Sequence, residues 1–338
     1  MTFKPLSVLD YLALKFPHND IIEKGILTTQ SRMIIGGHPG IGKSILATQI
    51  GIEVSRGDLV TDKFKSVKKR VLYVQEEIGP RSYQVRLKQV SDYYRNIDSF
   101  FIVSSAGFSF EDSALVLQLK QYIQSLKIEL LILDPLYKIH GKRENDATEL
   151  AQLTQLVDRL IVELNIAVII VHHLRKPFTT YKGETVAASM MDFRGSSVIQ
   201  AWADTMLMLE ATNEEDKVRL DFAKTRNAPE NINSVYLKLD RKNIRFTLIG
   251  KDGSTLFSID DDIITMLNTG PISEGHIVSG IKALHADTKL SIAHIKESLY
   301  NLALSGKIER QKNMCYLKPN LDSDISAWDL DNSSDGAI

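Results

Sequence analysis

One stretch of eight residues constrains this chain more than any other feature. It fits the pattern G-x-x-x-x-G-K-[ST] and consists of Gly37, His38, Pro39, Gly40, Ile41, Gly42, Lys43 and Ser44. The apolar segment 32–35 before it has the pattern of a short strand, and the segment 45–50 after it that of an amphipathic helix. Glycines let backbone N–H groups turn inward at a helix N-terminus, where the helix dipole favours anions. The stretch therefore predicts a phosphate-binding loop.

Two further side chains fit a nucleotide held in this loop. Lys43 would reach the β- and γ-phosphates, and the Ser44 hydroxyl would hold Mg²⁺, so we expect ATP and Mg²⁺ as cofactors. The apolar segment 130–133 ends in Asp134. Because ligands of open α/β sheets bind at the carboxyl ends of the strands, Asp134 is expected to hold Mg²⁺ through a water or through Ser44.

Length and composition limit the class of protein. A chain of 338 residues is longer than a usual single core, so a main domain and a smaller one are expected. No apolar run is long enough to span a bilayer, and the N-terminus lacks the layout of a secretion signal. A single cysteine, Cys315, excludes an internal disulfide and fits a reducing cytoplasm. Because the net charge is −1, any surface that binds nucleic acid must be local.

The order of elements predicts a mostly parallel sheet covered by helices. Nearly continuous apolar strands alternate with amphipathic helices as far as about residue 171. The strands are expected at 70–74, 100–103, 130–134 and 166–171, and the helices at 44–56, 81–95, 111–127 and 147–164. Beyond residue 205, four short strands in sequence, 206–209, 218–222, 235–239 and 244–248, are expected to extend the sheet with antiparallel edges.

The C-terminal part has a different pattern. A turn-rich break around 250–254 ends the α/β domain, which we place at 1–254. Three helical patterns and two short strands then predict a winged helix-turn-helix domain at 255–318. The last segment, 319–338, has five aspartates and no basic residue, so it is expected to be a disordered acidic tail.

Hydrolysis of ATP also needs a group that orients or deprotonates the attacking water. The strand at 71–74 is followed by Gln75, Glu76 and Glu77, which places paired acids at the edge of the sheet where the nucleotide would bind. The alternative for one or both glutamates is a solvated pair at a strand end.

Taken in order, several short motifs resemble those of the RecA/DnaB superfamily of ATPases, in particular the RepA-type hexameric helicases and the AAA_25 group of plasmid and phage proteins. The motifs lie at 36–44, 73–77, 133–136, 169–173, 194–197 and 223–227. The resemblance covers roughly residues 20–250. It implies a RecA-like fold and a catalytic glutamate after the second core strand, where Glu77 aligns slightly better than Glu76.

The resemblance also implies roles for polar residues elsewhere. His172 and His173 follow the last core strand, where the family places a sensor of the γ-phosphate; a structural histidine pair is the alternative. Lys224 and Arg226, which we expect on a loop of an edge strand, match a K-x-R whose side chains act across a subunit boundary, as an arginine finger does. Arg194 is a second candidate for a nucleotide or interface contact. A basic turn exposed to solvent is the alternative for Arg194 and Arg226.

DNA could contact the chain in two places. The long loops 138–145 and 174–191 leave the sheet near the nucleotide and carry basic and aromatic residues suited to a single strand. The segment 272–318 has seven Lys or Arg residues against four acids, and its helix 291–305 would present His294, Ser298 and Asn301 to a duplex. Winged helices also dock proteins, and the acidic tail offers a protein partner Trp328 and Leu330.

These features lead to one main functional hypothesis and two alternatives. The main hypothesis is a hexameric, ATP-driven DNA helicase that replicates or maintains a plasmid, phage or related element. The first alternative is a DNA-bound regulatory ATPase, KaiC-like or of the winged-helix type, that does not unwind DNA. The second is an adaptor that loads a helicase. The pair Lys224 and Arg226 favours a ring, whereas the C-terminal domain favours binding at specific sites.

Overall fold

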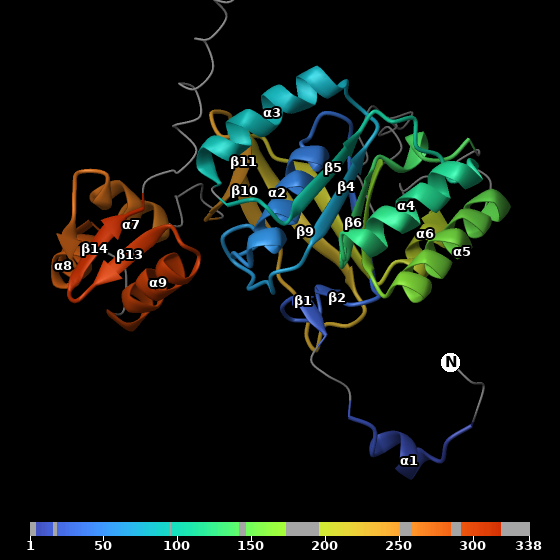
Figure 1. Cartoon of the computed structure of the whole chain (residues 1–338), viewed down its shortest axis with the longest axis horizontal. Helices are drawn as coiled ribbons and strands as arrows, with labels where there is room; N and C mark the ends of the chain where they lie inside the picture. Colours follow the sequence, from blue (N-terminus) through green and yellow to red (C-terminus); the bar gives the residue numbers. More distant parts are fainter. Residues whose placement is uncertain are drawn as a thin grey trace, which may run out of the picture. The chain divides into compact units, whose positions relative to one another are not determined.

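The computed structural model describes residues 5–15, 19–94, 96–141, 147–173, 196–250, 259–284 and 292–318. The chain forms two compact units, Met1–Thr255 and Leu256–Ile338 (Figure 1). Each unit is described by itself. A short helix, α1 (Val8–Leu12), precedes the larger unit's strands and is capped by the Ser7 side chain. Among the described residues, no helix combines the length and the apolar character needed to cross a bilayer.

The larger unit is built on a nine-stranded sheet with the strand order β11-β10-β9-β8-β3-β7-β6-β4-β5. Parallel pairing joins β3 (Arg32–Gly37), β4 (Val71–Gln75), β5 (Phe100–Ser104), β6 (Leu130–Asp134), β7 (Ala167–His173) and β8 (Thr205–Ala211). Antiparallel pairing then adds β9 (Lys217–Thr225), β10 (Val235–Asp240) and β11 (Arg245–Ile249). A separate two-stranded sheet consists of β1 (Asp20–Ile22) and β2 (Leu27–Thr28).

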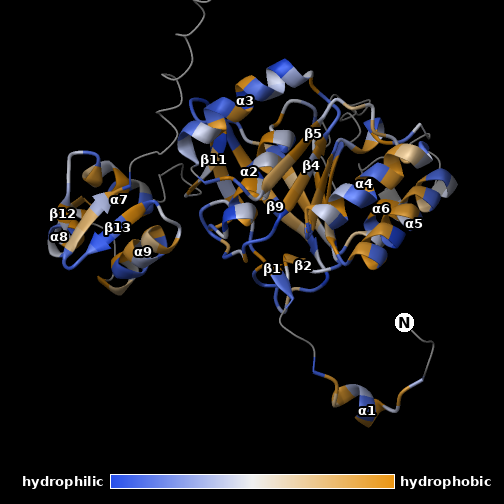
Figure 2. Ribbon diagram, viewed as in Figure 1, coloured by the Kyte–Doolittle hydropathy of each residue, from blue (hydrophilic) through white to orange (hydrophobic). Residues whose placement is uncertain are grey.

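Helices cover both faces of the sheet. Side chains of α2 (Lys43–Arg56) and α3 (Pro80–Tyr93) belong to one apolar core. Those of α4 (Ser113–Ser125), α5 (Ala147–Leu164) and α6 (Ser196–Trp202) belong to the other. In β3, Ile34 faces the second core and Ile35 the first, because successive side chains of a strand alternate in direction. Figure 2 shows β4 and β5 as largely hydrophobic and the helices as mixed.

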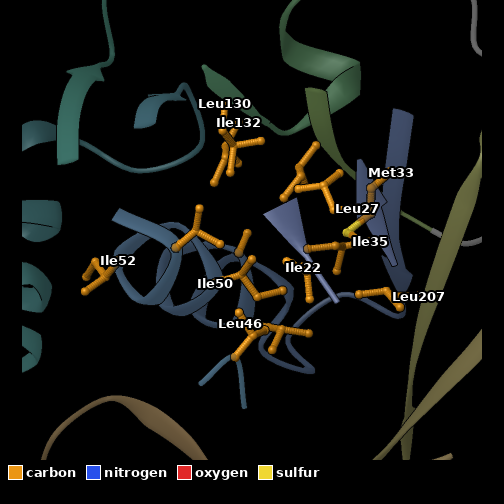
Figure 3. Packing of buried hydrophobic residues seen from close by; sticks show 14 of the residues in the cluster. Ile22, Leu27, Met33, Ile35, Leu46, Ile50, Ile52, Leu130, Ile132 and Leu207 are labelled. Carbon is orange, nitrogen blue, oxygen red and sulfur yellow. The ribbon is translucent and has the colours of Figure 1, made fainter. Parts of the chain in front are cut away.

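Helix α2, which follows the phosphate-binding stretch, packs closely on the sheet. Figure 3 shows Leu46 and Ile50 in the same cluster as Ile35 of β3. Burying one such side chain stabilises the fold by about 1.5–3 kcal/mol. At Gly51 a Cβ atom would lie 2.7 Å from the Phe100 ring and 2.8 Å from Ile132 Cδ1, so only glycine permits this approach. The close contact holds the second half of α2 against β5 and β6.

The prediction of a mostly parallel sheet covered by helices, with an antiparallel extension, is confirmed. Strand β6 and helix α5 have the predicted bounds, and the other core elements agree within a few residues. The paired strands β1 and β2 and the 3₁₀ turn η1 (Leu136–Lys138) were not predicted.

The smaller unit has its own apolar core. Helices α7 (Ile259–Leu267), α8 (Glu274–Leu284) and α9 (Ile292–Leu304) pack on an antiparallel sheet of order β12-β14-β13. Its strands are β12 (Ile272–Ser273), β13 (Ile308–Gln311) and β14 (Met314–Leu317). Cys315 is buried in this core. The assignment of this unit as a winged helix stays a prediction, and the acidic tail 319–338 lies outside the described residues.

One detail predicted for α9 is wrong. Ser298, expected to face a DNA groove, is buried and donates a hydrogen bond to Asp260 of α7. The serine therefore joins two helices of the core. Asn301 is exposed, and the side chain of His294 lies outside the described residues.

Candidate nucleotide-binding site

The sequence 37–44 forms the predicted loop between β3 and α2. Gly42 is the N-cap of α2, with a left-handed φ of 100°, and a Cβ atom there would lie 2.7 Å from the Phe246 ring. Any other residue at position 42 would thus be both strained and crowded. No side chain among the described residues caps the first turn of this 14-residue helix. Its N–H groups are available to an anion, as expected for a phosphate-binding loop.

Lys43 is a buried cation at this helix start. Its side chain is only 4% exposed, and Nζ donates a hydrogen bond of 2.8 Å to the backbone oxygen of His38. Burial lowers the pKa of Lys43 to about 8, an effect that the negative charges of Glu77 and Asp134 oppose. A buried ammonium group is costly without an anionic partner, so a polyphosphate would complement this side chain.

Asp134 ends β6 beside the loop, as predicted. It is 1% exposed, and Oδ2 accepts a hydrogen bond from the Tyr73 hydroxyl. Burial raises the pKa of Asp134 to about 6, while the hydrogen bond from Tyr73 opposes that rise. Oδ1 is buried without a hydrogen-bond partner among the described residues. A buried, unpartnered carboxylate oxygen beside a serine hydroxyl fits Mg²⁺ or one of its water ligands.

Glu77 also lies beside the phosphate-binding loop. The Ser44 hydroxyl donates to Glu77 Oε2 at 3.2 Å, and His173 Nε2 lies 3.8 Å from Glu77 Oε1. The His173 ring also lies 5.3 Å from that of Tyr137, which sequence reasoning did not single out. The structure thus brings Ser44, Glu77 and His173 together. The negative charge of Glu77 also acts to raise the pKa values of Lys43 and Asp134.

The neighbouring glutamate has different partners. The Glu76 carboxylate accepts hydrogen bonds from the backbone N–H groups of Ala106, Gly107 and Phe108, each at 3.1 Å. Its own N–H donates to the Asp134 backbone oxygen at 2.8 Å. The geometry therefore favours Glu77 over Glu76 as the residue beside the loop.

The two histidines of β7 are also placed differently. His172 is fully buried and pairs in register with Gly36 of β3. The side chain of His173 is 17% exposed and belongs to the site. Because adjacent side chains of a strand point to opposite faces, only one of the two could take part. The structure selects His173 for that position.

Lys224 and Arg226 lie near the opposite ends of the strands from the phosphate-binding loop. Lys224 is inside β9, an inner strand, so its expected place on an edge-strand loop is wrong. Its Nζ donates to the Gln200 backbone oxygen, and Arg226 pairs with Asp204 at 2.8 Å. The register places the end of β9 opposite Thr205, at the start of β8, whereas Gly37 pairs with Leu209. Arg194 lies outside the described residues.

Comparison with known proteins gives the family. Residues 1–178 match the AAA_25 family, described as an AAA domain, and the chain belongs to this family. It is 23% identical over 256 residues to a probable plasmid replicative DNA helicase of Chlamydia muridarum (strain MoPn / Nigg), covering 71% of this chain and 56% of that protein. It is 23% identical over 262 residues to the replicative DNA helicase DnaB of Treponema pallidum (strain Nichols), covering 71% of this chain and 54% of that protein.

A solved structure supports the fold assignment. A DnaB-like replicative helicase, described with its interactions with primase, matches with a TM-score of 0.51 and 16% identity, covering 65% of this chain and 57% of that chain. The larger unit therefore has the fold of the RecA/DnaB superfamily. The chain spans little more than half the length of the two curated helicases it matches.

Proposed function

We propose that this AAA_25 protein binds and hydrolyses ATP with Mg²⁺ and works as a DNA-dependent, ring-forming motor, a replicative helicase of a plasmid, phage or related element. The observation that carries the proposal is the convergence of Lys43, Ser44, Glu77 and Asp134 at the carboxyl edge of the parallel strands. Cation, metal ligands and water-orienting acid are the parts that phosphoryl transfer to water requires. The helicase names of the curated relatives support the choice of motor.

Each residue has one task in this proposal. The N–H groups at the start of α2 and the Lys43 ammonium bind the phosphates. Ser44 and Asp134 would hold Mg²⁺, which when bound would supply positive charge to neutralise the phosphate oxygens. Glu77 orients the attacking water, and His173, 3.8 Å from it, senses the γ-phosphate.

Lys224 and Arg226 act on a neighbouring subunit in this proposal. Within one chain, the end of β9 that carries them lies beside Thr205, whereas the phosphate-binding loop begins beside Leu209. These positions are four residues apart along β8, which corresponds to roughly 13 Å. An arginine side chain cannot bridge that distance to its own nucleotide. Because a ring joins unlike faces of successive subunits, this end of β9 would meet the nucleotide of the next copy.

DNA contacts complete the proposal. Single-stranded DNA would bind the loops 138–145 and 174–191, of which 142–145 and 174–191 lie outside the described residues. The smaller unit would bind duplex DNA as a winged helix. Lys312, at the turn between β13 and β14, is exposed and suited to a phosphate contact.

One observation favours a second candidate function for the smaller unit. The exposed side of α9 carries Ile292, Tyr300 and Leu304, exposed by 47%, 56% and 69%. Lys296 lies on the same side, but a helix face that is mostly apolar suits a protein partner better than a DNA groove. A chain that docks a protein here could instead serve as a helicase loader or a regulatory ATPase that does not unwind DNA.

An unwinding assay on a forked duplex, with ATP and with a non-hydrolysable analogue, separates these functions. It should be run beside native mass measurement with and without nucleotide. The proposed motor assembles into a ring and separates the strands only with ATP, and Glu77→Gln abolishes unwinding. Hydrolysis and assembly without strand separation would instead favour the loader or regulatory ATPase.

A further inference from the structure

We propose that Gln75 and Glu76 are positioning residues that together fix the turn carrying Glu77. The inference rests on the proposed function, in which Glu77 orients the attacking water. It adds that the two preceding side chains determine where the Glu77 carboxylate lies, although among the described residues they form no hydrogen bond with the phosphate-binding loop.

The buried Gln75 side chain hydrogen-bonds to the backbone of the turn. It is the last residue of β4 and is 2% exposed. Its Oε1 accepts from the N–H groups of Glu77 and Ile78 at 3.1 and 3.0 Å. Its Nε2 donates to the Ile78 backbone oxygen at 2.5 Å and to the Ser104 hydroxyl at 2.6 Å. All four hydrogen-bonding positions of the carboxamide are therefore occupied, two of them by the turn's N–H groups.

Glu76 ties the turn to neighbouring segments of the chain. Its carboxylate accepts from three consecutive backbone N–H groups, those of residues 106–108, which follow β5. Charge-assisted hydrogen bonds of this kind are stronger than neutral ones. The Glu76 N–H is bonded to the Asp134 backbone oxygen, so the peptide is also tied to β6. The residue that precedes Glu77 is thus anchored to β6 and to the segment that follows β5, the two strands that flank β4.

Glu77 itself has few anchors. Among the described residues, its carboxylate contacts the Ser44 hydroxyl at 3.2 Å and His173 at 3.8 Å, and both partners belong to the site it serves. The backbone under Glu77 therefore determines the position of its carboxylate. Since a misplacement of about 1 Å can cost roughly 10²-fold in rate, releasing either anchor should slow hydrolysis by about that factor.

The test compares Glu76→Ala, Glu76→Gln and Gln75→Met in the full-length protein. Steady-state ATP hydrolysis gives kcat, and a fluorescent ATP analogue gives the nucleotide Kd. We expect kcat to fall about 10²-fold in Glu76→Ala and Gln75→Met while Kd is unchanged. Glu76→Gln keeps one acceptor oxygen, which can take the place of Oε1 and accept from the N–H groups of Ala106 and Phe108. This variant should therefore have a much higher kcat than Glu76→Ala, with the pH profile of the wild type.

Asp112→Ala is the matched control. Asp112 is also a carboxylate that accepts from two backbone N–H groups after β5, at 2.9 and 3.1 Å. It caps α4, however, and within the described part of the chain it makes no hydrogen bond or ion pair with the turn at 75–78. A general loss of stability would affect this variant as well. Its kcat should stay at the wild-type value.

Three results would overturn the proposal. The first is wild-type kcat in both Glu76→Ala and Gln75→Met. The second is a loss in Glu76→Gln as large as in Glu76→Ala, with a changed acid limb of the pH profile, which would make Glu76 itself the base. The third is a parallel loss of nucleotide binding. Glu77→Gln is measured alongside: if it turns over at the wild-type rate, the role of Glu77 in the proposed function fails instead.

Discussion

Mixing two inactive variants tests whether Arg226 acts across a subunit boundary. Arg226→Ala has an intact phosphate-binding loop, and Lys43→Ala has an intact arginine. Alone, Arg226→Ala should lose roughly 10³–10⁵-fold in kcat, and Lys43→Ala should not bind ATP productively. Because Arg226 lies roughly 13 Å along the sheet from its own loop, removing it should leave that loop unchanged.

The expected recovery follows from this geometry. An active interface needs a loop from an Arg226→Ala subunit and an arginine from a Lys43→Ala neighbour. In a randomly assembled 1:1 mixture of a closed ring, that combination occurs at about one interface in four. Hydrolysis should therefore approach roughly a quarter of the wild-type rate if interfaces fire independently, and less if they fire in sequence. The assay is ATP hydrolysis against mixing ratio, with mixed rings verified by native mass spectrometry.

A matched arginine provides the control. Arg241 is 67% exposed and pairs with Asp216 at 2.6 Å, so Arg241→Ala should hydrolyse ATP at the wild-type rate without any partner. Mixed rings that show no recovery at any ratio would refute the trans assignment. Wild-type activity of Arg226→Ala alone would refute any catalytic role for this residue.

Three further predictions follow from burial and from the division into two units. ATP affinity should fall about tenfold per pH unit above pH 8, with proton uptake in calorimetry, because the phosphates need a charged Lys43 whose pKa burial lowers to about 8. Burial raises the pKa of Glu53 from 4.5 to about 7. The protonated carboxyl therefore contributes stability that is complete below pH 4.5 and is lost as the pH rises through 7. Glu53→Gln should reduce the resulting difference in Tm between pH 5 and pH 8. Deleting 255–338 should leave ATP hydrolysis nearly intact and abolish most duplex affinity, measured by fluorescence anisotropy against salt; unchanged duplex binding would mean that the smaller unit docks a protein.

The parts of the site that the sequence predicts are those in which spacing along the chain fixes position in space. A glycine-rich loop between a strand and a helix places Lys43 and Ser44 at a helix start, and a run of apolar residues ending in an acid places Asp134 at a strand end. Both depend on local backbone geometry and on the burial of a parallel strand on two faces. The same reasoning predicted β6 and α5 with their observed bounds.

The parts that were missed depend on contacts between distant segments. Nothing local separates Glu76 from Glu77; the N–H groups of residues 106–108, about 30 positions later, engage Glu76 and leave Glu77 beside Ser44. Strands β1 and β2 are only three and two residues long, too short for a pattern with period two. Ser298 is buried because Asp260 of α7 accepts its hydrogen bond, a partner 38 positions away.

The antiparallel half of the sheet joins the phosphate-binding loop of a subunit to that subunit's own arginine. Gln49 of α2 exchanges two hydrogen bonds with the Phe246 backbone, at 2.7 and 2.9 Å. Phe246 lies in β11, whose pairing continues through β10 to β9, next to Arg226. Glu53, one turn further along α2, shares a buried polar cluster with Arg245. Because this path consists of buried hydrogen bonds and packed strands, α2 and Arg226 should move as one body. In the proposed ring, a change at the nucleotide would therefore be expressed mainly as motion between subunits, at the boundary where Arg226 would meet the next phosphate-binding loop.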